Sequence, residues 1–189
     1  MEAFLVALVL VAIAEIGDKS LFLTILLMLR HRRPLPIVGG LVLGILANLA
    51  LAAAAGSLLA DWLDARLLAW VVGGAFVAMA VWSLIPEQDG LVEPMSGSSL
   101  LLTAAVSYFM LEMADKTQLA TLALAARFDA FLPVLAGAVL GVVLVNAPAI
   151  WLGHKYAARL PMRMIRWICA LLALSLGLWI LAEAAGLFD

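Results

Sequence analysis

The chain has 189 residues, of which 67% are hydrophobic and 13% charged, and its mean hydropathy is +1.17. This composition excludes an ordinary soluble domain and indicates an integral membrane protein. The formal net charge of -2 is too small to suggest nucleic acid as a partner. The single cysteine, Cys169, allows neither an internal disulfide nor a CxxC metal site.

Apolar segments of about 20 residues, the length that crosses a hydrocarbon core of roughly 30 Å, recur along the chain. The first resembles a signal peptide, but no Lys or Arg precedes its apolar run, so we expect a membrane helix there. The segments are continuously apolar, unlike the alternating strands of a membrane barrel, and are therefore predicted to be helices. In chain order, the six expected spans are about 3–29, 36–60, 67–86, 98–126, 131–153 and 164–186.

One polar stretch interrupts this pattern. Residues 87–97 belong to a stretch rich in proline, glycine, serine and acidic residues, which is typical of a linker. The sequence therefore predicts a first three-helix unit at 1–86 and a second at 98–189.

The two halves repeat each other at a constant spacing. Glu-Ile-Gly-Asp-Lys-Ser at 15–20 returns 97 positions later as Glu-Met-Ala-Asp-Lys-Thr at 112–117. Because each half has three spans, the second must enter the membrane from the opposite side, which gives two inverted three-helix repeats. Four further pairs have the same spacing: Gly40 and Gly137, Gly44 and Gly141, Trp70 and Trp167, and Trp82 and Trp179.

Basic residues predict the orientation. Seven basic residues lie in the connections after the first and fifth spans, on one side of the predicted bundle, whereas the connections on the opposite side contain only Arg66 and Arg127. By the positive-inside rule, the side with seven basic residues is cytoplasmic, and both termini are non-cytoplasmic. The seven basic residues after the first and fifth spans are Arg30, Arg32, Arg33, Lys155, Arg159, Arg163 and Arg166.

The repeated motif places charged side chains at membrane depth, where each costs on the order of 3 kcal/mol. In both copies the acids and the lysine lie within four positions, so on a helix they lie close together. Inverted repeats bring equivalent helices together near the midplane. We therefore expect four carboxylates at one metal site, with two lysines balancing charge: Glu15, Asp18, Glu112, Asp115, Lys19 and Lys116.

Carboxylate oxygens suit Mn²⁺, Ca²⁺ and Mg²⁺ alike. With both lysines charged, the four acids leave a formal charge of -2, which one divalent cation or two protons would cancel. This balance suggests exchange of one divalent cation for two protons. A purely structural interpretation, in which each Glu pairs with the Lys of its own motif, accounts for only one acid in each copy.

Neighbouring polar residues extend the predicted site. Asn48 and Asn146 lie within stripes of small residues that pack helices together, which would bring their amide oxygens toward the charged helices. Gly17 would permit a local break in the first motif, whereas Ala114 makes the second copy less pliable. Three residues would reach the site only if the helices unwind: Ser20, Thr117 and Gln118.

The duplicated E-x-G-D-K-[ST] motif in two three-helix halves resembles a family of cation/proton antiporters, which includes the Golgi calcium and manganese transporters of eukaryotes and the small manganese exporters of bacteria. The one departure is Ala114 where the motif has glycine. The resemblance implies that the acids of both motifs bind the transported cation. The compact chain is similar to the bacterial branch, which implies a multi-pass protein of the inner membrane that exports Mn²⁺, or Ca²⁺, as a substrate, with no cofactor.

Two other classes of protein share parts of this pattern. An intramembrane aspartyl protease would also place two aspartates, here Asp18 and Asp115, on separate spans. The Glu and Lys of each motif have no role in that chemistry, so an enzyme is not expected. A cation channel or a carrier for an organic cation is the alternative function. The expected partners are a divalent ion, protons and the lipid bilayer. Assembly of several copies of this chain into a homo-oligomer is a further alternative that the sequence leaves open.

Overall fold

The computed structural model describes residues 1–16, 18–85, 99–152 and 162–187. Within these ranges the secondary structure is helical and contains no strand, which confirms the predicted all-α class. The predicted linker at 87–97 lies outside the described residues, as does Gly17. The helices are α1 (Glu2–Glu15), α2 (Lys19–His31), α3 (Pro34–Trp62), α4 (Ala65–Leu84), α5 (Leu100–Leu111), α6 (Lys116–Phe128), α7 (Phe131–Leu152) and α9 (Met162–Ala184).

Four of the described helices contain an apolar stretch long enough to cross a membrane. These stretches are Pro34–Trp62, Ala65–Leu84, Phe131–Pro148 and Trp167–Ala184. They agree with the second, third, fifth and sixth expected spans. The chain is therefore a multi-pass membrane protein.

The first and fourth expected spans, 3–29 and 98–126, are not single helices, and the prediction of six continuous helices is wrong at these two places. Each is divided at the charged motif, into α1 and α2 in the first half and α5 and α6 in the second. The aspartate of each motif has extended backbone angles and precedes a new helix: Asp18 has φ -80° and ψ 172°, and Asp115 has φ -102° and ψ 172°. Aspartate favours such an N-cap because its carboxylate accepts from the first free N–H groups, as Asp18 does from the Lys19 amide at 2.7 Å.

The second break occurs although alanine replaces the glycine of the motif. Ala114 has a left-handed backbone with φ 57°, a conformation that costs a residue with a Cβ roughly 1–2 kcal/mol. The side-chain oxygen of Gln118 accepts a hydrogen bond from the Ala114 amide at 2.7 Å. This bond satisfies a backbone donor that the break removes from the helix, and it helps to hold the strained turn.

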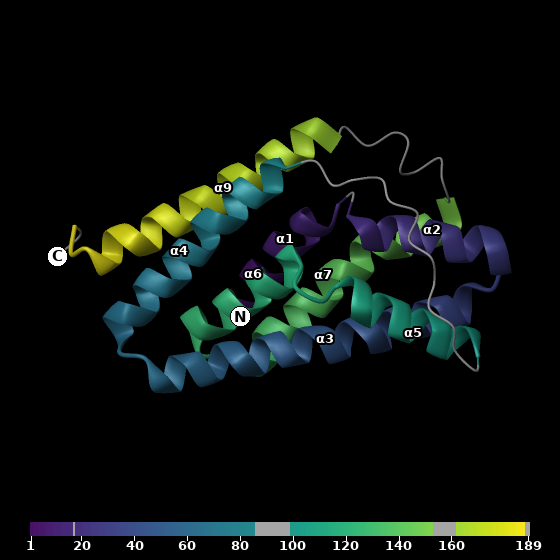
Figure 1. Ribbon diagram of the computed structural model, residues 1–189, viewed down its shortest axis with the longest axis horizontal. Coiled ribbons are helices and arrows are strands. Elements are labelled where there is room, and N and C mark those ends of the chain that lie inside the picture. The colour runs from purple at the N-terminus through teal and green to yellow at the C-terminus, as the bar shows by residue number, and fades with distance from the viewer. Residues whose placement is uncertain (17, 86–98, 153–161, 188–189) are drawn as a thin grey trace.

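The helices pack mainly across the two halves. Helix α1 packs on α7, α3 packs on α5 and α6, and α4 packs on α9. Figure 1 shows α4 beside α9 along one edge of the molecule and α3 along the opposite edge, with α1, α6 and α7 between them in this view.

Glycines allow the closest of these approaches. A Cβ added to Gly40 would lie 2.7 Å from the carbonyl oxygen of Leu101, and one added to Gly137 would lie 2.3 Å from that of Phe4. Both members of the first contact lie 97 positions from their counterparts in the second. The glycine stripes are therefore packing surfaces between the halves, and the same backbone spacing recurs in both.

Candidate functional site

Four buried carboxylates lie at the two helix breaks. Glu15 is the last residue of α1 and Asp18 caps α2, while Glu112 follows α5 and Asp115 precedes α6. Their exposed fractions are 0%, 2%, 2% and 5%, so none is a surface acid. The breaks thus place the acids of each motif between two half-helices rather than along one face of a continuous helix.

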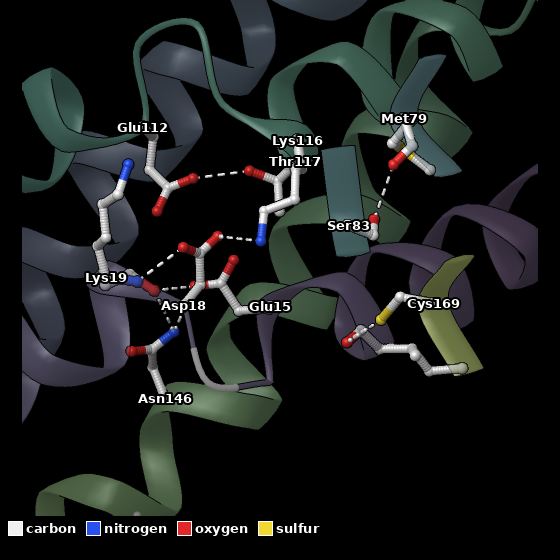
Figure 2. Close-up of polar contacts among 12 residues, drawn as sticks. Glu15, Asp18, Lys19, Met79, Ser83, Glu112, Lys116, Thr117, Asn146 and Cys169 are labelled. Atoms are coloured by element: carbon white, nitrogen blue, oxygen red, sulfur yellow. Dashed lines mark hydrogen bonds and ion pairs between the residues drawn. The ribbon is translucent and has the colours of Figure 1, made fainter. Parts of the chain in front are cut away.

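The two motifs meet through an ion pair. The Nζ atom of Lys116 lies 3.9 Å from Oδ2 of Asp18, and both side chains are buried. Figure 2 shows the Lys116 side chain reaching from its own segment toward Asp18. The break at 112–115 separates Glu112 from the helix that Lys116 begins, and this contact joins Lys116 to an acid of the other half.

Hydrogen bonds hold the first glutamate from two sides. The Ser20 hydroxyl donates to Oε1 of Glu15, and the Asn146 amide donates to the same oxygen at 2.9 Å. The other oxygen, Oε2, is buried and has no hydrogen-bond partner among the described residues. The broken helix brings Ser20 to the carboxylate, and the packing of α7 on α1 brings Asn146 to it.

The second glutamate receives a matching hydroxyl. Thr117 Oγ1 donates to Oε2 of Glu112 at 2.6 Å, as Ser20 does to Glu15 in the first half. Figure 2 shows the Thr117 bond alongside the Lys116 ion pair. Two breaks with the same sequence spacing thus produce the same hydroxyl–carboxylate contact.

Asn48 is held differently from Asn146. Its Nδ2 atom donates to the backbone carbonyl of Phe109 at 3.0 Å, and its buried Oδ1 has no hydrogen-bond partner in the described part of the chain. Gln118, the remaining polar residue of the prediction, is bonded to the Ala114 amide at the break. Asn48 therefore has a buried side-chain oxygen that is not used in a hydrogen bond among the described residues, whereas the side-chain oxygen of Gln118 stabilises the backbone turn at Ala114.

The carboxylates share a buried region without forming a closed cage in this conformation. Among the described residues, no three Asp, Glu, His or Cys side chains lie close enough together to hold one metal ion. The donors in the region are carboxylate, amide and hydroxyl oxygens, which are the ligands that hard divalent cations prefer. Binding by acids of both motifs would require them to move closer.

Two buried polar residues that the sequence analysis did not identify join this network. Tyr108 Oη lies 2.6 Å from Thr24 Oγ1, which lies 2.8 Å from Oδ1 of Asn146. Thr24 has a signal in the sequence, because it lies one helical turn after Ser20 and returns as Thr121 at the repeat spacing. Tyr108 has no such signal, since Val11 stands at the corresponding position.

The chain matches a family model twice. The model, described as divalent cation/proton antiporter GDT1, matches residues 3–90 and again residues 100–187. The two matches begin 97 positions apart and also end 97 positions apart, which is the spacing between the charged motifs. Each half of the chain is thus similar to the same family.

Relatives cover nearly the whole chain. A Vibrio cholerae protein named "Putative manganese exporter" is 39% identical over 179 residues, which span 94% of this chain and 90% of that protein. A Synechocystis protein named "GDT1-like protein sll0615" is 25% identical over 194 residues, spanning 91% and 93%. No solved structure matches the chain. The family predicted from the motif is confirmed, and the chain belongs to the GDT1 family of divalent cation/proton antiporters.

Proposed function

We propose that this protein exports a divalent cation from the cytoplasm in exchange for protons, and that this cation is Mn²⁺, with Ca²⁺ as the alternative. The observation that carries the proposal is the set of four buried carboxylates at two helix breaks, joined across the halves by the ion pair of Lys116 and Asp18. The family supports cation/proton exchange, and the name of the Vibrio cholerae relative supports manganese and export.

In the membrane, α1 with α2 and α5 with α6 each form one discontinuous span, so the chain crosses six times as two inverted repeats, 1–86 and 98–189. The paired family matches and the paired glycine contacts support this arrangement. Broken helices near the midplane are typical of ion sites in transporters built from inverted repeats. The basic loops favour non-cytoplasmic termini and, for a bacterial exporter, the inner membrane.

The cation binds between the motifs, with Glu15, Asp18, Glu112 and Asp115 as its principal ligands. Because these acids do not surround one point in the present conformation, binding draws the two breaks together and displaces Lys116 from Asp18. The buried Oδ1 of Asn48 is a further oxygen ligand. Ser20 and Thr117 orient the two glutamates through their hydroxyl groups.

Exchange follows from the charge at this site. Four carboxylates and two ammonium groups carry a formal charge of -2 when the site is empty, and either one divalent cation or two protons restores neutrality. Burying an uncompensated charge of this size in the membrane is unfavourable, so the protein changes its open side mainly when the site is loaded. That restriction couples the outward movement of the cation to the inward movement of protons.

Flux in proteoliposomes tests the proposal. Purified protein is reconstituted with a metal indicator and a pH indicator inside the vesicles, and Mn²⁺, Ca²⁺ or Mg²⁺ is added outside. We expect Mn²⁺ entry to be accompanied by proton exit and to be abolished by loss of all four carboxylates. Cation entry without opposing proton flux, together with electrical conductance, would establish a channel instead. Transport of an organic cation that Mn²⁺ does not compete with would establish the other alternative.

A further inference from the structure

A chain of buried polar groups leads from the second half of the protein to Glu15. It begins at Tyr108 on α5, passes through Thr24 on α2 and ends at Asn146 on α7, whose amide donates to Glu15. The exposed fractions of Tyr108, Thr24 and Asn146 are all 0%, so water cannot replace any link from outside. These groups therefore depend on one another for their hydrogen bonds.

The donors and acceptors fix one direction along this chain. The hydroxyl of Thr24 has a single hydrogen, and it faces two acceptors, Oδ1 of Asn146 at 2.8 Å and the carbonyl oxygen of Ser20 at 2.9 Å. Tyr108, at 2.6 Å, must then donate to Thr24, because the opposite assignment takes the hydrogen away from both carbonyls. The chain runs from the phenol through Thr24 toward the amide.

The same direction continues into the carboxylate. With Oδ1 of Asn146 turned toward Thr24, its Nδ2 faces Oε1 of Glu15 at 2.9 Å and the carbonyl of Val142 at 3.1 Å. Oε1 also accepts from Ser20 and is thus occupied by two donors. The oxygen of Glu15 that is left for a cation or a proton is Oε2, which is buried without a hydrogen-bond partner among the described residues.

The second half lacks this arrangement. The counterpart of Tyr108 is Val11, which has no polar side-chain atom, and the counterpart of Thr24 is Thr121, which donates to the carbonyl of Thr117 in its own helix at 2.7 Å. Asn48 donates to a backbone carbonyl rather than to a carboxylate. The first motif thus has a glutamate oriented by a chain that starts at Tyr108 in the other half, and the second motif has no tyrosine at the corresponding position.

We propose that Tyr108 is a positioning residue for cation binding: through Thr24 and Asn146 it orients Glu15 so that Oε2 alone of this carboxylate faces the transported ion. This inference rests on the proposed function. It makes the two motif glutamates unequal, with Glu15 held in place by the opposite half and Glu112 oriented within its own motif by Thr117. Tyr108 itself does not touch the ion.

The test measures the concentration dependence of Mn²⁺ transport in proteoliposomes. Y108F and T24V each break the chain, and we expect each to raise the apparent KM for Mn²⁺ by about 3- to 10-fold, the effect of losing one buried hydrogen bond, with Vmax within about twofold of wild type. T24S keeps the hydroxyl and retains the wild-type KM. The matched control T121V removes the equivalent hydroxyl of the other half and leaves KM unchanged.

The double variant Y108F/T24V tests whether the two residues act on Mn²⁺ binding through one chain. Because both substitutions interrupt the same chain, the double variant should have the KM of T24V alone. A KM increase equal to the product of the single effects would mean that the two residues act independently and would overturn the inference. A loss of Vmax with an unchanged KM would also overturn it. If Y108F does not fold, the comparison of T24V with T24S and T121V still tests the Thr24 link through which Tyr108 acts, and a T24V KM equal to that of T24S would overturn the inference.

The same vesicles separate this inference from the proposed function. If the wild-type protein exchanges Mn²⁺ for protons while Y108F and T24V keep the wild-type KM, only the role of Tyr108 is wrong. If the wild-type protein moves no Mn²⁺ against protons, the proposed function fails and the inference fails with it.

Discussion

Lys116 of α6 lies 3.9 Å from Asp18, the residue that caps α2, so a cation from one half of the chain faces a carboxylate of the other inside the protein. Both groups are shielded from water, with side-chain exposures of 11% and 1%. A buried pair of this kind has a strong effect when only one member is removed, because the remaining charge is no longer compensated.

Replacing Lys116 with Gln should therefore lower stability as well as transport. Removing one partner of a buried ion pair typically costs about 3–5 kcal/mol, and we expect a marked decrease in the unfolding temperature of the detergent-purified protein. K116R, which keeps the charge, should retain most of the stability. An unfolding temperature of K116Q equal to that of wild type would show that the pair contributes little in this conformation.

Amide variants of the four motif acids test the site itself. E15Q, D18N, E112Q and D115N should each reduce Mn²⁺ transport at least about tenfold, because each removes one of the four negative charges proposed to balance the cation. Mn²⁺ flux in vesicles and the manganese tolerance of a sensitive strain both report this loss. E183Q is the matched control, since Glu183 is exposed and pairs with Arg127 at 2.7 Å away from the motifs. Normal tolerance in all four motif variants would contradict the site.

At Ala114, replacing alanine with glycine should raise stability, although the same replacement lowers stability in an ordinary helix. Its positive φ favours glycine, so A114G should stabilise the protein by about 0.5–1 kcal/mol, measured as an increased unfolding temperature. The control A78G, on an exposed face in the interior of α4, should destabilise by a similar amount, because glycine weakens an ordinary helix. If both variants shift the unfolding temperature downward, the left-handed turn is not strained.

The close glycine contacts between the two halves predict which glycines cannot be replaced by a larger residue. A Cβ on Gly44 would lie 2.3 Å from the carbonyl oxygen of Ala105, whereas a Cβ on Gly74 would meet no atom within 4 Å. G44A should therefore destabilise the protein by about 1–3 kcal/mol, as overpacking does elsewhere. G74A should be neutral or stabilising. The yield and the unfolding temperature of the two purified variants provide the comparison, and equal behaviour would argue against the close approach.

The sequence predicted much of this arrangement because it contains the same motif twice. The constant spacing of 97 residues identified the two halves, and the cost of charge in a membrane singled out Glu15, Asp18, Glu112 and Asp115 as one region. These acids are buried at the helix breaks. Their assignment as ligands of the cation is part of the proposed function.

Other features could not be predicted from spacing. Alanine favours a continuous helix, so the left-handed turn at Ala114 depends on packing and on the bond from Gln118. Rules for neighbours on one helix cannot find the pairing of Lys116 with Asp18, because these two residues belong to different halves of the chain. Comparison of the halves also cannot identify Tyr108, whose counterpart is Val11.

The packing of the helices has a consequence for how the chain assembles. Helix α3 packs mainly on α5, α6 and α7, and α1 packs mainly on α7, so each half surrounds itself with helices from the other, as partners do in a domain-swapped dimer. Neither half can complete its own interior, and the contacts named here join described helices on either side of 86–98. Residues 1–86 and 98–189, produced as two separate polypeptides in one cell, should therefore associate, and either fragment alone should be degraded.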